Sequence, residues 1–332
     1  MTTDILVTGG AGYIGAHMCK LLAAQGYRVT VFDNLSTGHA RAVRWGEIVH
    51  ADLRDRTQVM RAFDAHSYAA IFHFGGCSLV GESMADPRKY YDNNVGGTLN
   101  LLQAMREHDV QRIIFSSTAA IYGNPESALI SEGHPKRPIN PYGRSKWMIE
   151  QILDDCHAAY GLQSAALRYF NAAGASDEAD IGEDHNPETH LIPNVLRSAR
   201  LRTPVRLFGK EYPTPDGTCV RDYIHVTDLC FAHLAALDRL EANGGILRLN
   251  LGTGCGHSVR EVIDAAAVVC GKPVAVETAP PRAGDPATLV ACADLAHDVL
   301  GWQPQHSNLL NILETAWRWE TAQGTNPDKS RA

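Results

Sequence analysis

Short apolar runs alternate with amphipathic stretches along the first half of the chain. The runs are rich in β-branched residues and lack strict polar–apolar alternation, which indicates strands buried on both faces of a parallel sheet. Six strands are predicted, at residues 4–8, 28–33, 47–51, 69–74, 112–117 and 164–170. Helices are predicted between them, at about residues 14–25, 55–65, 87–108 and 141–160. This order predicts a doubly wound α/β domain.

The pattern changes after about residue 171. Residues 174–190 are rich in Gly, Asp, Glu and His, and predict a loop at the carboxyl edge of the sheet. Further helices are predicted at 191–203, 226–240, 258–270 and 308–322, and strands at 204–209, 246–251 and 274–278. We therefore expect an α/β fold with a doubly wound parallel (Rossmann) sheet in residues 1–173 and a smaller mixed α/β substrate domain in residues 174–323. Segments near 215–255 are expected to return to the sheet, and residues 324–332 to form a frayed tail.

A glycine-rich turn, residues 8–15 (TGGAGYIG), joins the first predicted strand to the first helix. Gly9 permits a tight turn, Gly12 lets the backbone approach a phosphate, and Gly15 lets the helix pack closely on the strand. The helix N-terminus would then bind a pyrophosphate through free N–H groups. The spacing is Gly-x-x-Gly-x-x-Gly, and its position after the first strand favours a dinucleotide site over an ordinary turn.

An acidic residue, Asp33, ends the second predicted strand. An acid about 20 residues beyond the glycines usually accepts hydrogen bonds from the adenosine ribose. Because a 2′-phosphate would meet this carboxylate, NAD is favoured over NADP. Arg41 and Arg44 lie further along a predicted loop, and the alternative for Asp33 is a cap on the next turn.

Composition narrows the class of protein. The chain has 332 residues and a net charge of −7, so a nucleic-acid partner finds no support. There is no apolar run of about 18 residues and no basic segment preceding an apolar one near the N-terminus, so we expect no membrane span and no signal peptide. The eight cysteines form no Cys-x-x-Cys pair, which is typical of reduced thiols in a cytoplasmic protein. His185 and His190 share one loop, but no metal-ligand spacing is recognised and no metal is expected.

A Tyr-x-x-x-Lys pair, Tyr142 and Lys146, follows Pro141 at the start of a predicted helix. Four residues make about one helical turn, so both side chains project from the same face. A nearby ammonium and a positively charged nicotinamide would lower the pKa of the tyrosine, which could then take a hydroxyl proton while hydride leaves the same carbon. Thr118, at the carboxyl end of a strand, could hydrogen-bond the reacting oxygen; its alternative is a bond to its own turn.

These motifs together resemble the extended short-chain dehydrogenase/reductase family, and within it the UDP-sugar 4-epimerases, over about residues 4 to 320. The segments that carry the resemblance are residues 8–15, 32–35 (FDNL), 80–83 (VGES), 90–95 (YYDNNV), 116–118 (SST), 141–143 (PYG), 168–171 (RYFN) and 217–225 (GTCVRDYIH). The resemblance implies interconversion of UDP-galactose and UDP-glucose. Tightly bound NAD takes hydride from C4, Tyr142 takes the O4 proton, the 4-keto sugar turns over, and hydride returns to the opposite face.

The resemblance also implies site residues. Beyond the glycine turn, Thr118, Tyr142 and Lys146, it places at the cofactor Tyr13, Ile14, Asp33, Asn34, Asp52, Leu53, Phe74, Ser78, Asn93 and Phe170. Beyond Thr118 and Tyr142, it places at the UDP-sugar Asn171, Leu191, Phe208, Arg221, Arg282, Asp285 and Leu289. The two arginines suit a diphosphate because guanidinium groups pair with phosphate oxygens. Their alternative is a surface ion pair, and that of Asn171 is a cap on a turn.

Four positions depart from well-known members of the family. Ser78 replaces a lysine near the cofactor phosphates, and Thr118 replaces a serine but keeps the hydroxyl. His190 stands where an asparagine often contacts substrate, and its role stays open. Leu289 stands where members restricted to hexoses carry a tyrosine, so N-acetylated sugars are a possible substrate class. The loop at 185–190 is similar to that of members acting in polysaccharide or UDP-pentose metabolism.

Other readings remain. The nearest is a sister 4-epimerase acting on UDP-arabinose and UDP-xylose, or on UDP-N-acetylhexosamines. A dehydratase would place an Asp-Glu pair just after Thr118, where this chain has Ala119 and Ala120. Net oxidation by a dehydrogenase would release NADH, and a non-enzymatic NAD-binding regulator would often lack Tyr142 or Lys146. The family is commonly homodimeric, with helices near 87–108 and 141–160 at the interface, although an apolar helix face is more often intramolecular core.

Overall fold

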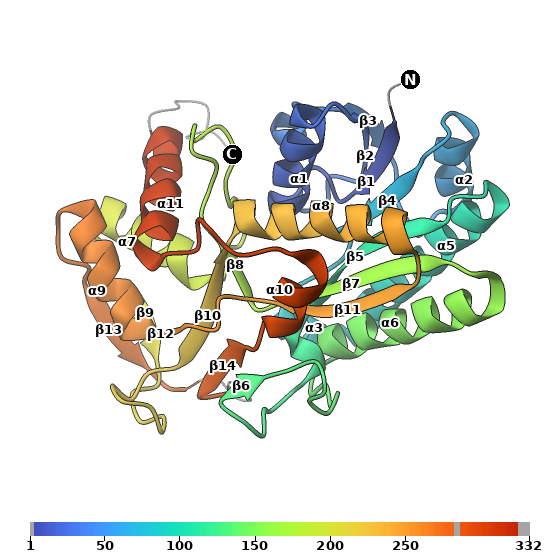
Figure 1. Ribbon diagram of the computed structural model, residues 1–332. Coiled ribbons are helices and arrows are strands. Elements are labelled where there is room, and N and C mark those ends of the chain that lie inside the picture. The colour runs from blue at the N-terminus through green and yellow to red at the C-terminus, as the bar shows by residue number, and fades with distance from the viewer. Residues whose placement is uncertain (1–2, 282–285, 325–332) are drawn as a thin grey trace.

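A seven-stranded parallel sheet forms the larger part of the molecule, in the order β3-β2-β1-β4-β5-β7-β11 (Figure 1). The computed structural model describes residues 3–281 and 286–324. The strands are β1 (Asp4–Thr8), β2 (Arg28–Asp33), β3 (Glu47–His50), β4 (Ala70–His73), β5 (Arg112–Thr118), β7 (Gln163–Tyr169) and β11 (Ile246–Leu251). The order reverses between β1 and β4, which confirms the predicted doubly wound fold.

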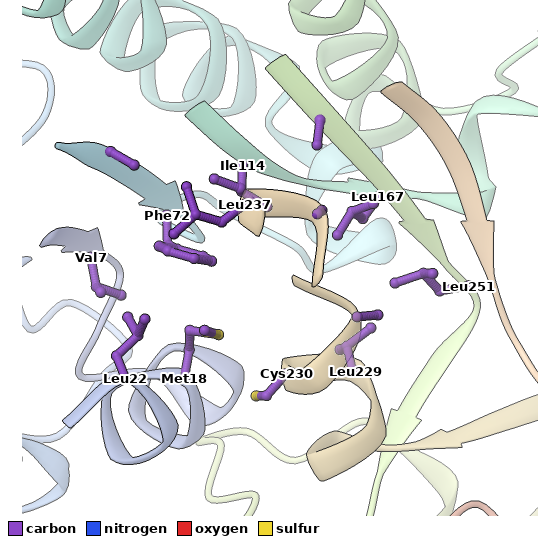
Figure 2. Close-up of a cluster of buried hydrophobic side chains, with 14 of the residues drawn as sticks. Val7, Met18, Leu22, Phe72, Ile114, Leu167, Leu229, Cys230, Leu237 and Leu251 are labelled. Atoms are coloured by element: carbon purple, nitrogen blue, oxygen red, sulfur yellow. The ribbon is translucent and has the colours of Figure 1, made fainter. Parts of the chain in front are cut away.

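Helices cover both faces of this sheet because successive strand residues point to opposite sides. On one face, strand residues such as Val7, Phe72 and Ile114 pack against α1 (Tyr13–Ala24) and α8 (Val226–Asn243) (Figure 2). On the other face, alternate residues such as Leu6 and Phe115 pack against α2 (Arg56–Asp64), α5 (Gly97–Glu107) and α6 (Pro141–Tyr160). Burial on both faces explains why these strands lack polar alternation.

A second group of elements lies beside the carboxyl edge of the large sheet (Figure 1). A sheet with the path β12-β10-β14-β6, to which β8 adds beside β10, combines β6 (Leu129–Ile130), β8 (Asn171–Ala173), β10 (Val220–His225), β12 (Gly256–Ser258) and β14 (Thr288–Ala291). Strands β9 (Val205–Phe208) and β13 (Val276–Ala279) form a separate pair. A third core joins α7 (Leu191–Leu201), α9 (Val259–Cys270) and α11 (Leu309–Gly324). The domain division near residue 173 stays a prediction, and residues 325–332 of the expected tail lie outside the described residues.

Several elements differ from those expected. The helix expected at 87–108 is divided into α4 (Pro87–Tyr90), a π-helix η2 (Tyr91–Gly96) and α5, with α3 (Val80–Ala85) before them. Strand β7 ends at Tyr169, so Phe170 lies in a bend before β8. The pattern also missed β6, β10, β12 and β14, the helix α10 (Asp294–Leu300), and the 3-10 turns η1 (Ala40–Ala42) and η3 (Ala119–Ile121). Strands β6 and β12, with two and three residues, offer too few positions for a periodic signal.

Among the described residues, no helix is both long and apolar enough to cross a membrane.

Candidate active site

The glycine turn has the tight geometry that its spacing predicts. Gly9 has a positive φ of 71°, and a Cβ there would lie 2.6 Å from the backbone nitrogen of Gly75, at the end of β4. A Cβ on Gly15 would lie 2.1 Å from the Gly9 carbonyl oxygen. Gly12 is the N-cap of α1 and supplies no side-chain cap, so the first N–H groups of the helix stay available to an anion. This turn fits a dinucleotide pyrophosphate.

The carboxylate of Asp33 is fixed at the end of β2, beside this turn. One oxygen accepts a hydrogen bond from the Ala11 N–H at 3.0 Å, and the other accepts one from the Leu35 N–H at 2.8 Å. Burial raises the pKa of Asp33, while these two hydrogen bonds lower it. Arg41 contacts Asp184, and Arg44 lies over the Trp45 ring, so both guanidinium groups face other partners. The arrangement suits a ribose diol and therefore NAD.

Three further residues expected at the cofactor gather at the carboxyl edge after β2 and β3. The Asn34 amide donates to the Asp52 carboxylate at 3.0 Å. Arg54 also donates to Asp52 at 2.7 Å and holds the pKa of that carboxyl well below its ordinary value. Leu53 is buried against Gly97 and Gly75, where a Cβ would lie 2.9 Å and 2.8 Å from it. The polar side chains of Asn34 and Asp52 therefore lie beside the apolar side chain of Leu53.

Thr118 and Tyr142 meet at the carboxyl end of β5. Helix α6 begins at Asn140, whose side chain accepts from the Gly143 N–H at 2.8 Å. A Cβ on Gly143 would lie 2.5 Å from the Ala120 carbonyl oxygen, so glycine lets the first turn of α6 approach the residues after Thr118. Burial raises the pKa of the Tyr142 phenol, and its hydrogen bond with Thr118 acts in the opposite direction. The structure thus brings together two of the three predicted catalytic side chains.

Lys146 lies one helical turn further along α6 and is 4% exposed. Its ammonium donates to the Ser116 carbonyl oxygen at 2.8 Å and lies 4.7 Å from the centre of the Phe115 ring. Burial lowers the pKa of Lys146 to about 8. The Lys146 ammonium therefore donates its hydrogen bond to the backbone of β5 and not to the Tyr142 phenol. The sequence did not indicate this partner.

The other residues expected around the cofactor follow the ends of β4 and β7. The Phe74 ring lies 5.0 Å from the ring of His233 on α8. Ser78 is exposed before α3. The Asn93 amide donates to Asn94 at 3.0 Å, within the π-helix, a rare element that is frequent at functional sites. Tyr13 donates to the Gly174 carbonyl oxygen at 2.7 Å, and Ile14 packs on the adjoining core.

The expected substrate side is assembled by strand pairing. In the parallel pair β10 and β14, Arg221 is the register partner of Leu289. Leu289 packs against a small buried cluster of Ala119, Ile121, Tyr122 and Ile130, and Phe170 packs against the same cluster. The pairing therefore brings the strand of the predicted diphosphate ligand, Arg221, beside a residue that packs on the cluster that follows Thr118.

The remaining expected substrate residues are more scattered. The Asn171 amide donates to the Asp222 carbonyl oxygen at 3.0 Å, which ties β8 to β10. Leu191 is the first residue of α7, and Phe208 ends β9. Arg282 and Asp285 lie outside the described residues.

Two buried polar residues that support the site were missed from the sequence. Asn94 accepts from the Cys77 N–H at 2.8 Å and donates to Ser145 Oγ at 3.0 Å, which links α6 to the loop after β4. Asp222 accepts hydrogen bonds from the backbone of Thr253 and Ala291 at 2.9 and 3.2 Å. Asn94 lay inside the recognised YYDNNV segment, and Asp222 inside GTCVRDYIH. From the sequence, the preceding residues Asn93 and Arg221 were expected to be the functional ones. Only the fold shows that the side chains of Asn94 and Asp222 point inward.

Known proteins share both the sequence and the fold. Residues 5–252 match the NAD dependent epimerase/dehydratase family. The chain is 50% identical over 316 residues to a UDP-glucose 4-epimerase of Halalkalibacterium halodurans, with 95% of each chain covered. A UDP-glucose 4-epimerase from Brucella ovis in complex with NAD matches with a TM-score of 0.92 and 48% identity, over 95% of this chain and 98% of that chain.

A UDP-glucose 4-epimerase from Bifidobacterium longum, in complex with NAD+ and UDP, matches with a TM-score of 0.92 and 39% identity, over 97% of this chain and 99% of that chain. The family match covers most of the chain, and the relatives are similar over nearly their whole length. The chain belongs to the NAD dependent epimerase/dehydratase family.

Proposed function

We propose that this chain is a UDP-glucose 4-epimerase, an isomerase that interconverts UDP-galactose and UDP-glucose through a 4-keto intermediate with NAD as its resident cofactor. The observation that carries the proposal is the meeting of Thr118 and Tyr142 at the carboxyl end of β5, with Lys146 one turn along α6. The 50% identity to a UDP-glucose 4-epimerase over nearly the full chain supports it.

The proton steps belong to Tyr142. The Tyr142 side chain is half-buried and its phenol shares a hydrogen bond with Thr118, so the two hydroxyl groups are placed to hold one sugar oxygen between them. Tyr142 would take the O4 proton as the carbonyl forms and return it when the carbonyl is reduced. Thr118 would keep the oxygen in place during both steps. The Lys146 ammonium, on the same helix face, adds positive potential that favours the phenolate.

The residues that would hold NAD are the glycine turn at its pyrophosphate and Asp33 at its adenosine ribose. When bound, NAD supplies the acceptor and then the donor of the C4 hydride, and a positive nicotinamide ring beside Tyr142. Arg221 is the proposed ligand of the substrate diphosphate. Anchoring at the diphosphate leaves the sugar ring room to turn over. Ala119 and Ala120 follow Thr118, so this place offers no acid for protonating a leaving hydroxyl, which argues against dehydration.

The test is turnover of UDP-galactose by the purified chain without added reductant, with sugar nucleotides separated by chromatography. We expect UDP-glucose to form without net NADH. The Tyr142→Phe variant should lose at least about a hundredfold in turnover, since general acid–base catalysis contributes about that much or more, while it still binds UDP. Stoichiometric NADH release would instead indicate a dehydrogenase. Full activity in Tyr142→Phe would remove the assigned base.

A second candidate is a sister 4-epimerase with a broader substrate range, acting on UDP-N-acetylhexosamines or on UDP-arabinose and UDP-xylose. Leu289 supports it, because this side chain packs against the apolar cluster that includes Ala119, the residue after Thr118. A branched aliphatic side chain there leaves more room than the tyrosine of hexose-restricted relatives would.

The oligomeric state, the location and the pathway of the enzyme are proposed from separate observations. A homodimer is supported by exposed apolar side chains on the neighbouring helices α5 and α6, with Leu99 49% and Met148 40% exposed. A cytoplasmic location is supported by the eight cysteines, none of which is joined in a disulfide. Galactose metabolism is the proposed pathway, because the enzyme would connect UDP-galactose with UDP-glucose.

A further inference from the structure

Two glutamates and two histidines converge in the segment between β8 and α7. They are Glu183, His185, Glu188 and His190, and one ligand atom from each lies within 4.8 Å of the other three. His190 Nδ1 lies 2.7 Å from a Glu183 oxygen and 3.0 Å from a Glu188 oxygen. His185 Nδ1 lies 3.2 Å and 3.7 Å from the same two carboxylates. Both imidazoles thus face both carboxylates.

The two carboxylates are withdrawn from water. The Glu183 side chain is 6% exposed and that of Glu188 is 1% exposed. Two buried negative charges require compensation close by. Either two protonated imidazoles or one divalent cation bound by neutral imidazoles would balance them.

Unsatisfied polar atoms favour the cation. His185 Nδ1 and Glu188 Oε2 are both buried and neither makes a hydrogen bond of good geometry, although His185 Nδ1 lies within ion-pair distance of both carboxylates. These two atoms lie 3.7 Å apart. A buried lone pair without a donor is costly, whereas two such atoms at this separation can both bind an ion lying between them.

The donor set selects the class of ion. In a tetrahedral zinc site the bond lengths of about 2.0–2.2 Å place neighbouring ligand atoms about 3.3–3.6 Å apart. The nitrogen–oxygen distances of 2.7–3.7 Å in this cluster span that value. Calcium and magnesium prefer oxygen ligands alone, whereas two imidazoles suit zinc and similar transition metals.

We propose that Glu183, His185, Glu188 and His190 form a binding site for one divalent cation of the zinc class. Four protein ligands fill a tetrahedral shell, so the site is structural rather than catalytic. No metal was expected here from the sequence, because only the two histidines were weighed and not Glu188 between them or Glu183 before them.

Neighbouring residues hold the ligands in place. Trp319 of α11 donates to the Glu183 carbonyl oxygen at 3.0 Å. The Thr189 and His190 N–H groups donate to one Glu188 oxygen, and the edge of the Tyr13 ring faces His185 at 6.5 Å between ring centres. Such supporting contacts orient metal ligands. The ion would hold residues 183–190, the segment that leads into Leu191 of α7, in one conformation.

The test is calorimetric titration of the purified, EDTA-treated full chain with zinc chloride. We expect one equivalent of Zn²⁺ per chain, and binding at least about tenfold weaker in the double variant His185→Gln/His190→Gln. The matched control is His108→Gln, because His108 pairs with the single exposed carboxylate of Asp64 at 3.1 Å. This control should bind zinc as the unchanged chain does.

A second measurement does not depend on the variant folding. Crystals of the unchanged chain soaked in zinc chloride should show an anomalous peak among the four side chains. No zinc binding by the unchanged chain, equal affinity in the double variant, or a peak only elsewhere would overturn the proposal. The cluster would then be a set of ion pairs between protonated imidazoles and carboxylates.

Discussion

Lys146 should carry a stability cost that its catalytic role requires. Its ammonium is buried at 4% exposure, and burial lowers its pKa from 10.5 to about 8. Below pH 8 this lysine is charged in both the folded and the unfolded chain. At about 1.4 kcal/mol for each pH unit between the two pKa values, holding the charge in the fold costs about 3 kcal/mol.

Replacing Lys146 by Met removes that cost and keeps an unbranched side chain of similar length. The change also leaves the Ser116 carbonyl oxygen without the ammonium that donates to it at 2.8 Å, which costs about 1–3 kcal/mol. The balance is a stabilisation of about 1 kcal/mol at pH 7. For a chain of this length, that corresponds to a rise in Tm of about 1–2 °C. Turnover should fall sharply in the same variant.

The pH dependence distinguishes this cause from better packing. Between pH 8 and pH 10.5 the unfolded chain binds more protons at Lys146 than the folded chain does, so the unchanged protein gains stability in this window. The Met variant has no such gain, and its advantage should shrink towards pH 10. The assay is thermal unfolding of nucleotide-free protein at pH 7 and pH 10. A Met variant that melts below the unchanged protein at pH 7, or an advantage that does not change with pH, would refute the reasoning.

Three other substitutions test separate parts of the structure. Gly15→Ala puts a Cβ 2.1 Å from the Gly9 carbonyl oxygen; bound NAD, measured by absorbance of the purified protein, should be lost, and normal cofactor content would contradict the packing argument. Glu150→Gln leaves the buried Arg168 guanidinium, which donates to Glu150 at 2.6 Å, without its counter-charge; about 3 kcal/mol should be lost and Tm should fall by about 4 °C, whereas an unchanged Tm would show that the pair adds nothing. Leu289→Tyr should lower turnover of UDP-N-acetylgalactosamine at least about tenfold with UDP-galactose turnover retained, and equal effects on both substrates would remove the residue from specificity.

The part of the fold that is coded locally could be predicted from the sequence. The glycine turn, Asp33 and the Tyr142–Lys146 spacing each lie within one or two neighbouring elements, and their geometry follows from strand and helix periods. Helix α6 has the predicted bounds: Pro141 marks its start in the sequence, and in the structure the glycine at 161, with φ of 77°, ends it. The break at Tyr91–Gly96 could not be predicted, since six residues are too few for a change of helical period to show in the sequence pattern.

The remainder of the candidate site depends on contacts between distant segments. Arg221 and Leu289 become neighbours only through the pairing of β10 with β14. The cluster around His185 and His190 likewise requires a loop to fold back on itself, with Glu183 and Glu188 turned inward. Contacts between distant residues leave no periodic pattern in the sequence, so each of these residues could be considered only by itself.

Asp222 shows how the fold stabilises one of these contacts, the pairing of Arg221 with Leu289. Its side chain is fully buried on β10, and burial raises the pKa of the carboxyl while hydrogen bonds from Thr253, Gly254 and Ala291 lower it. Those donors lie on the segment after β11 and on β14, so one carboxylate fixes the strand that carries Arg221 against both. Asp222, the residue that follows Arg221 on β10, therefore holds the register that puts Arg221 beside Leu289. The proposed diphosphate ligand and the proposed specificity residue consequently keep a fixed relation to each other, and Leu289 packs against the apolar cluster that includes Ala119, the residue after the catalytic candidate Thr118.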